Sequence, residues 1–200
     1  MSAAIEFYFD FSSPYSYLAS ELIDELAAKY GRAVEWRPIM LGAAFQKAGT
    51  QLLINVPLKG PYSLRDFSRS ARFYGVNFKF PQKFPLATHY AARAYYSLMA
   101  RSDPRTREFA HAIFRAYWVD GRDISELPIM LKVATETGFD AQALSEAVNM
   151  PEIKERLRAE TEAAIARGMF GAPYIIVDGE PFWGADRLPQ IERWLATGGF

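Results

Sequence analysis

Two serines stand where an apolar strand pattern runs into a helical pattern, in the stretch FYFDFSSPYSYLAS at residues 7–20. The turn before a helix brings together a side-chain hydroxyl, free backbone N–H groups and the positive end of the helix dipole. Such groups stabilise a bound anion, and the chain contains no cysteine that could supply a thiolate itself. An isolated Ser12 or Ser13 is more often only an N-cap, so a chemical role depends on the rest of the sequence.

The composition favours a globular protein that binds a small ligand. Half of the 200 residues are hydrophobic and 15% are aromatic, which is enough for a substantial core. The 23 Lys and Arg balance 23 Asp and Glu, and no long run of one charge predicts binding to nucleic acid or an anionic membrane. The start MSAAIEFYFDF lacks a signal-peptide pattern, and no apolar run reaches membrane-spanning length. We therefore expect a cytoplasmic protein with a neutral or anionic small-molecule ligand and no partner among nucleic acids or membranes.

The elements that must position these serines follow from periodicity and turn residues. Strand patterns cover 5–11 and 33–40 and flank a helical pattern that begins at Pro14 and ends at Gly31. Residues 42–61 are irregular in pattern. Helices are then predicted at 63–74, 87–101, 105–119, 126–137, 141–148 and 152–167. The segment APYIIVDGEPFWG predicts a hairpin around Asp178 and Gly179, and a last helix covers 186–196.

The order of these elements predicts an α/β protein with a thioredoxin-like fold and a large all-helical insertion. The thioredoxin-like domain comprises residues 1–41 and 169–200, and the helical insertion domain comprises residues 42–168. Pro173 precedes the hairpin, at the place where this fold has a cis-proline beside its active turn. Without that surrounding order, Gly171 and Pro173 are adequately explained as residues that end a loop.

The motifs FYFDFSSPYSYLAS, VEWRPIMLG, NVPLKGPYSLRD, FGAP and FWGADRL together resemble those of the 2-hydroxychromene-2-carboxylate isomerases. This family is related to kappa-class glutathione transferases and to DsbA-like disulfide oxidoreductases, and the resemblance extends from about Ile5 to Leu195. In the redox relatives the first helix begins with Cys-x-x-Cys, whereas this chain has Ser-Ser-Pro-Tyr. The resemblance therefore implies that glutathione supplies the thiol as a cofactor.

The resemblance also implies how glutathione is held. Ser13 would donate a hydrogen bond to the glutathione sulfur as the catalytic residue, and Asp186 would bind the ammonium group. Asp186 is equally well explained as an acid that caps the last helix, and both roles are compatible. Lys59 is similarly open, because a lone lysine is usually a solvated charge. The implied glutathione-binding residues are Ser13, Asn55, Lys59, Ala172, Pro173, Trp183, Gly184, Ala185, Asp186 and Arg187.

For the substrate we expect an aromatic carboxylate in a flat apolar cleft. Tyr15, Tyr90 and Trp183 are predicted to border this cleft, and Lys59 or Arg37 to meet the substrate carboxylate. The sequence departs from the family pattern at Leu86, close to a position that is often Asn, and at Ala185, which weakens the assignment of one particular substrate. Other polar side chains are interpreted structurally: His89 as a packed or surface residue, and Asp66, Arg69 and Arg72 as an ion-pair face of a helix.

The predicted function is a glutathione-dependent cis–trans isomerase that acts on a hydroxychromene carboxylate or a related keto acid in aromatic catabolism, as a likeness to the family implies, with a homodimer as the expected assembly. One alternative is a kappa-like transferase or peroxidase at the same site. A second alternative is a non-catalytic glutathione- or peptide-binding protein. No metal site is predicted, because the carboxylates and histidines lack ligand spacing.

Overall fold

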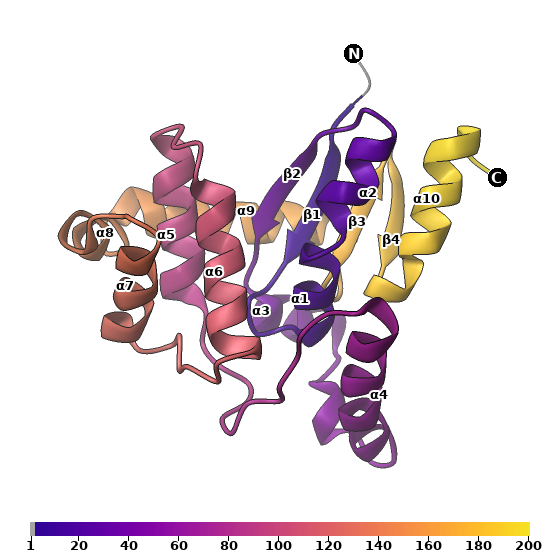
Figure 1. Ribbon diagram of the computed structural model, residues 1–200, viewed down its shortest axis with the longest axis horizontal. Coiled ribbons are helices and arrows are strands. Elements are labelled where there is room, and N and C mark those ends of the chain that lie inside the picture. Colours follow the sequence, from indigo (N-terminus) through magenta and orange to yellow (C-terminus); the bar gives the residue numbers. More distant parts are fainter. Residues whose placement is uncertain (1–2) are drawn as a thin grey trace.

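The computed structural model describes residues 3–200 and contains a four-stranded sheet with the strand order β2-β1-β3-β4 (Figure 1). β1 pairs in parallel with β2 and antiparallel with β3, and β3 and β4 form an antiparallel hairpin. The strands are β1 (Ile5–Phe9), β2 (Val34–Pro38), β3 (Tyr174–Val177) and β4 (Glu180–Trp183). This sheet and its helices confirm the predicted α/β thioredoxin-like fold with helices inserted between its halves.

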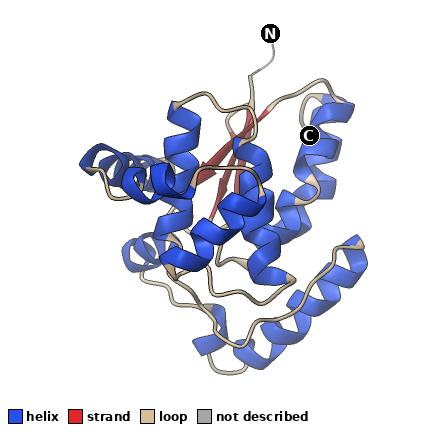
Figure 2. Cartoon of the chain, turned by 60° about the vertical axis from the view of Figure 1, so that its left-hand side comes forward, coloured by secondary structure: helices blue, strands red, loops and turns tan. Residues whose placement is uncertain are grey.

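Helices enclose the sheet, as Figure 2 shows. They are α1 (Pro14–Ser20), α2 (Ile23–Lys29), α3 (Leu41–Ala48), α4 (Lys59–Tyr74), α5 (His89–Ala100), α6 (Thr106–Trp118), α7 (Leu127–Glu136), α8 (Ala141–Ala147), α9 (Pro151–Ala166) and α10 (Leu188–Thr197), with short 3-10 helices η1 (Leu53–Asn55) and η2 (Ala185–Arg187). Within the described residues, no helix is long and apolar enough to cross a membrane. α4 lies beyond the end of β1, next to the turn that follows this strand (Figure 1).

Alternation along β1 gives the sheet two different apolar faces. Phe7 and Phe9 belong to the main core, whereas Tyr8 belongs to a smaller cluster that includes side chains of α3 and α9. The main core continues from the sheet into the helical block, where the ring of Phe114 lies 5.4 Å from that of Phe9. The Trp118 indole N–H donates to the carbonyl of Phe11 at 2.9 Å. The predicted thioredoxin-like and helical parts therefore share one continuous core.

The hairpin turn adopts the predicted conformation. Asp178 and Gly179 have φ values of 53° and 90°, as a two-residue turn with both central residues left-handed requires. The Ala172–Pro173 bond is cis, as expected beside the active turn of this fold. A second cis bond, at Phe84–Pro85, was not predicted.

Two predicted stretches differ from the structure. The helix expected from Pro14 to Gly31 is divided into α1 and α2 at residues 21–22, and the stretch 42–61 contains α3, η1 and the first turn of α4. α3 is short, with only Ala44 buried, and it ends at Gly49 in the left-handed conformation. α4 begins at Lys59 in spite of Pro61, because proline is tolerated in the first turn of a helix.

Candidate active site

Ser13 is the N-cap of α1 and is also in contact with the cis-proline loop. Its Oγ accepts a hydrogen bond from the N–H of Ser16 at 3.1 Å and donates one to the carbonyl of Ala172 at 3.0 Å. Pro14 occupies the first helical position, where its missing N–H has no cost. The serine is 4% exposed. The capping role and a position suited to chemistry therefore coexist in this one residue.

The buried carboxylate of Asp10 stabilises the turn between β1 and α1. It accepts hydrogen bonds from the N–H of Ser12 at 2.8 Å, the hydroxyl of Thr88 at 2.8 Å and the N–H of Leu41 at 2.9 Å. Burial raises the pKa of Asp10 above its ordinary value, and these three donors oppose the rise. The Ser12 hydroxyl accepts the N–H of Leu86 at 2.9 Å. Ser12 therefore links the turn to the segment before α5, whereas Ser13 links it to the cis-proline loop that borders the cavity.

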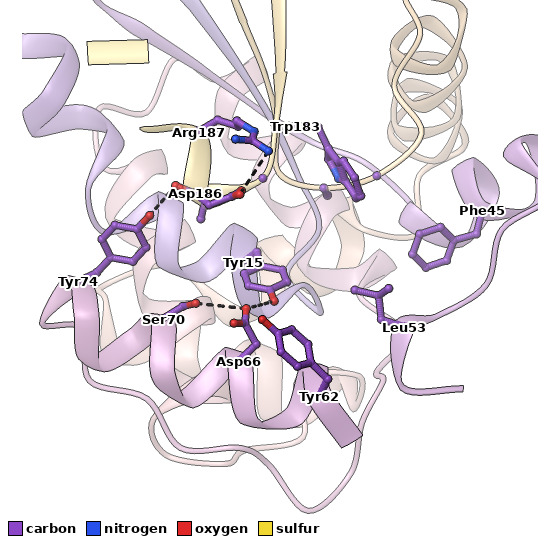
Figure 3. A pocket seen from close by; sticks show the side chains of 14 residues that line it. Tyr15, Phe45, Leu53, Tyr62, Asp66, Ser70, Tyr74, Trp183, Asp186 and Arg187 are labelled. Atoms are coloured by element: carbon purple, nitrogen blue, oxygen red, sulfur yellow. Dashed lines mark hydrogen bonds and ion pairs between the residues drawn. The ribbon is translucent and has the colours of Figure 1, made fainter. Parts of the chain in front are cut away.

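A cavity of about 430 Å³ lies between α1, α4 and the segment from β4 to η2 (Figure 3). Its size is within the range of small-molecule sites. Much of its wall is aromatic, with a few charged groups at the margins. Seven of the predicted site residues line it: Tyr15, Ala172, Trp183, Gly184, Ala185, Asp186 and Arg187. The structure thus brings the first helix and the C-terminal segment together as the resemblance implied.

Asn55 and Lys59 lie near this cavity without lining it. Both are exposed, and they occupy the end of η1 and the start of α4. Leu53 and Tyr62, their neighbours along the chain, do line the cavity. Ser13 and Pro173 are not among the lining residues, but both are next to one: Ser13 is hydrogen-bonded to the carbonyl of Ala172, and Pro173 follows Ala172 in the chain.

The structure does not bring Arg37 and Tyr90 to this cavity, which corrects their predicted position in a substrate cleft. Arg37 follows the buried Trp36 in β2, so its side chain lies on the opposite face of the sheet from that of Trp36. There its guanidinium pairs with Glu35 at 2.5 Å and Glu160 at 3.0 Å. Tyr90 packs against the imidazole of His89, with ring centroids 4.1 Å apart.

One wall of the cavity was not predicted, and it comes from α4. Tyr62, Asp66, Ser70 and Tyr74 all line the cavity, and they recur at every fourth position. This spacing puts them on one side of the helix, and it is the signal that could have identified them. The predicted pairing of Asp66 with Arg69 is present, but Asp66 also faces the cavity.

Two hydrogen bonds join this α4 wall to the rest of the site. The Tyr15 hydroxyl donates to Asp66 Oδ2 at 2.5 Å, and the Tyr74 hydroxyl donates to the carbonyl of Ala185 at 2.9 Å. Burial, and then the hydrogen bond to the Asp66 carboxylate, raise the pKa of Tyr15. Tyr15 therefore stays protonated and leaves its oxygen lone pairs available to a donor group in the cavity.

Two glycines let the C-terminal segment fold closely around the cavity. A Cβ at Gly171 would collide with the indole of Trp183, and a Cβ at Gly184 would collide with the carboxylate of Asp186. Gly184 also has a φ of 106°, which side chains other than glycine rarely adopt. The carboxylate of Asp186 is 71% exposed and lies 3.6 Å from the guanidinium of Arg187.

The cavity also presents a backbone donor. Ala172 is buried next to the cis-proline, and within residues 3–200 no protein oxygen accepts from its N–H. An unpaired N–H at a cavity wall is available to the carbonyl of a peptide-like ligand. The combination of this donor with Asp186 and Arg187 suits a ligand that is both peptide-like and charged.

The sequence profile of the DSBA-like thioredoxin domain matches residues 4–196. A 2-hydroxychromene-2-carboxylate isomerase of Sphingobium xenophagum is 36% identical over 200 residues, which cover 98% of this chain and 99% of the relative. A glutathione S-transferase kappa 2 of Caenorhabditis elegans is 26% identical, with 96% and 91% covered. A solved structure of a 2-hydroxychromene-2-carboxylate isomerase superposes with a TM-score of 0.87 at 28% identity and covers 97% of this chain and 95% of that chain.

The chain therefore belongs to the DsbA-like thioredoxin family and, within it, to the 2-hydroxychromene-2-carboxylate isomerase group. The family resemblance stated from the motifs is confirmed, and so is the enzyme class. The roles of individual residues remain predictions that the geometry described above can support.

Proposed function

We propose that the protein is a glutathione-dependent isomerase of a hydroxychromene carboxylate or a related aromatic-derived keto acid. The observation that carries the proposal is the position of Ser13, at a helix N-terminus and against the cis-proline loop, in a chain without a thiol. An aromatic cavity opens next to this point. The names of the isomerase and kappa transferase relatives support the reaction and the cofactor respectively.

The residues around the cavity fit glutathione. The unpaired N–H of Ala172 would donate a hydrogen bond to the cysteinyl carbonyl, as an added strand pairs with a sheet edge. The largely exposed carboxylate of Asp186 would hold the γ-glutamyl ammonium group. Asn55 and Lys59 would meet the glycyl end from the start of α4, where both are exposed.

When bound, glutathione would supply a thiolate that adds to the substrate and later leaves, so that the former double bond can rotate in between. Ser13 now donates its single hydroxyl proton to the carbonyl of Ala172. To stabilise a thiolate, the hydroxyl must turn toward the sulfur while its oxygen still accepts the N–H of Ser16. The positive end of α1 adds to this stabilisation. The protein thus supplies donors and orientation to the reacting sulfur.

The aromatic walls would orient the second reactant. Tyr15 and Trp183, which the sequence analysis assigned to the substrate, both line the cavity (Figure 3). Their flat rings suit a planar aromatic acid. Lys59 remains the proposed partner of the substrate carboxylate, because the guanidinium of Arg37 is already paired with carboxylates on the other face of the sheet.

Kinetics on 2-hydroxychromene-2-carboxylate, with and without glutathione, test the proposal. We expect turnover that requires glutathione and does not consume it. A rate that is the same without glutathione would refute the mechanism. Because kappa transferase relatives cover 96% of the chain, a transferase is the second candidate, and it predicts one glutathione consumed per turnover. Light scattering would check the proposed homodimer.

A further inference from the structure

A second cavity, of about 270 Å³, lies where the N-termini of α3 and α5 meet α9. It shares no lining residue with the candidate active site. Met40, Leu157 and Ile165 give it an apolar side, and His89, Arg93 and Lys154 give it a polar side. Nothing in the proposed reaction uses these groups.

Arg93 is the unusual member of this cavity. Within residues 3–200, no side chain or carbonyl accepts a hydrogen bond from its guanidinium, and no carboxylate lies within ion-pair distance. Its Nε is completely enclosed and has no partner. Burial lowers the pKa of Arg93, and Tyr90 opposes this shift only in part. Because buried polar atoms in proteins are normally hydrogen-bonded, an acceptor such as an anion is the group that the Arg93 Nε–H lacks.

Two further cations, Arg158 and Lys154, line the cavity, and only Arg158 has a carboxylate partner within the described residues. Arg158 is held by Glu155 at 2.5 Å and by Glu162 at 2.6 Å, so the carboxylate of Glu162 at the cavity wall is already paired. Lys154 has no carboxylate partner in the part of the chain that the structure describes. Arg93 and Lys154 therefore both line one small cavity, and within residues 3–200 neither is paired with a carboxylate.

The neighbouring His89 can contribute a hydrogen-bond donor to the cavity while its imidazole is neutral. Burial, and then the charge of Arg93, lower the pKa of His89 below its ordinary value. A neutral imidazole still has one N–H donor. It can thus donate a hydrogen bond to an anion without itself being charged.

We propose that this second cavity binds a small organic carboxylate. The planar fork of Arg93 matches a carboxylate, and Lys154 adds a second charge. The apolar side formed by Met40, Leu157 and Ile165 suits a hydrocarbon body in preference to a fully hydrated inorganic anion. The cavity is smaller than the usual range for drug-sized ligands, which limits the occupant to about one ring.

Nitrogen–proton correlation spectra of the full chain test this proposal, with the side-chain Nε–H of Arg93 as a local signal. Benzoate is the probe, benzamide is its uncharged control and inorganic phosphate is the hydrated anion. We expect benzoate to shift the Arg93 signal in a saturable manner, and benzamide to leave it unchanged. Phosphate should bind about tenfold or more weakly, because it gains nothing from the apolar side.

Two variants and a matched control complete the experiment. In the variants, benzoate binding is followed by the signals of the His89 imidazole. Arg93→Gln should weaken binding by about tenfold or more, and the affinity of Arg93→Lys should lie between those of Arg93→Gln and the wild type. Arg101→Gln, which removes an exposed arginine at the other end of α5, should leave binding unchanged. An unshifted Arg93 signal, equal binding by Arg93→Gln, or phosphate binding as tightly as benzoate would each overturn the proposal.

Discussion

Replacement of Ser13 is the most direct probe of the candidate active site. Ser13→Ala removes the hydroxyl that is proposed to donate to the thiolate, and a hydrogen bond to a charged acceptor contributes about 1.5–3 kcal/mol. The rate at saturating glutathione should therefore fall about tenfold to a hundredfold. The same change removes an N-cap that accepts the N–H of Ser16 at 3.1 Å, which costs about 1 kcal/mol of stability.

A second replacement separates the two losses. Ser13→Gly also lacks the hydroxyl, but glycine at an N-cap costs only a few tenths of a kcal/mol relative to serine. Both variants should therefore lose the same share of turnover. Both also lose the hydrogen bond to the Ala172 carbonyl, so both should be less stable than the wild type in urea denaturation, with Ser13→Ala the less stable of the two. Ser12→Ala is the matched control, since Ser12 accepts the N–H of Leu86 at 2.9 Å and should affect stability more than rate.

The assay is initial-rate kinetics with saturating glutathione, together with a pH titration of the bound thiol by its ultraviolet absorbance. Loss of the donor should raise the pKa of bound glutathione in both Ser13 variants. If the rate of Ser13→Gly stays within about threefold of the wild-type rate, the donor role is refuted. A rate loss in Ser12→Ala equal to that in Ser13→Ala would show that the wrong hydroxyl had been chosen.

Three further predictions concern the cavity and the sheet. Tyr15→Phe removes the hydroxyl that reaches Asp66 at 2.5 Å and should lower the free energy of unfolding by about 1–2 kcal/mol, and urea curves unchanged from the wild type would contradict this. Asp186→Ala should raise the calorimetric Kd for glutathione about tenfold with little change in kcat, and an equal loss in kcat would show a catalytic role. Burial raises the pKa of Glu6, but hydrogen bonds from Arg167 and Tyr8 leave it below its ordinary value of 4.5, so its stabilising effect is present above that pH and is lost as the pH falls through the folded-state pKa. The destabilisation by Glu6→Gln in urea should therefore shrink in acid, and a constant difference would contradict the sign.

Local sequence signals predicted the parts of the site that depend on local backbone. Ser13 followed by Pro14 marked the helix start, and Asp178-Gly179 marked the hairpin turn. Both depend on conformational preferences of a few consecutive residues. The position of Pro173 depended on the order of elements, and the cis bond is present there.

The parts that could not be predicted depend on contacts between distant segments. The pairing of Arg37 with Glu160 requires knowledge that α9 covers that face of the sheet. The wall formed by α4 could not be predicted, for two reasons. The scattered glycines and prolines before it indicated a loop. In addition, an acid and an arginine three residues apart are adequately explained by a surface ion pair. A single sequence gives the spacing of Asp66 but not its partner Tyr15 on another helix.

The hydrogen bond between Ser13 and Ala172 joins residues that are 159 positions apart in the chain. During synthesis on a ribosome, the first helix and its serine emerge long before the segment that completes the cavity. β1 can pair with β2 early, but its other edge has no neighbour until β3 has been made. The cavity therefore cannot form until almost the whole chain has been translated, and an exposed strand edge has to be kept from aggregation during that interval.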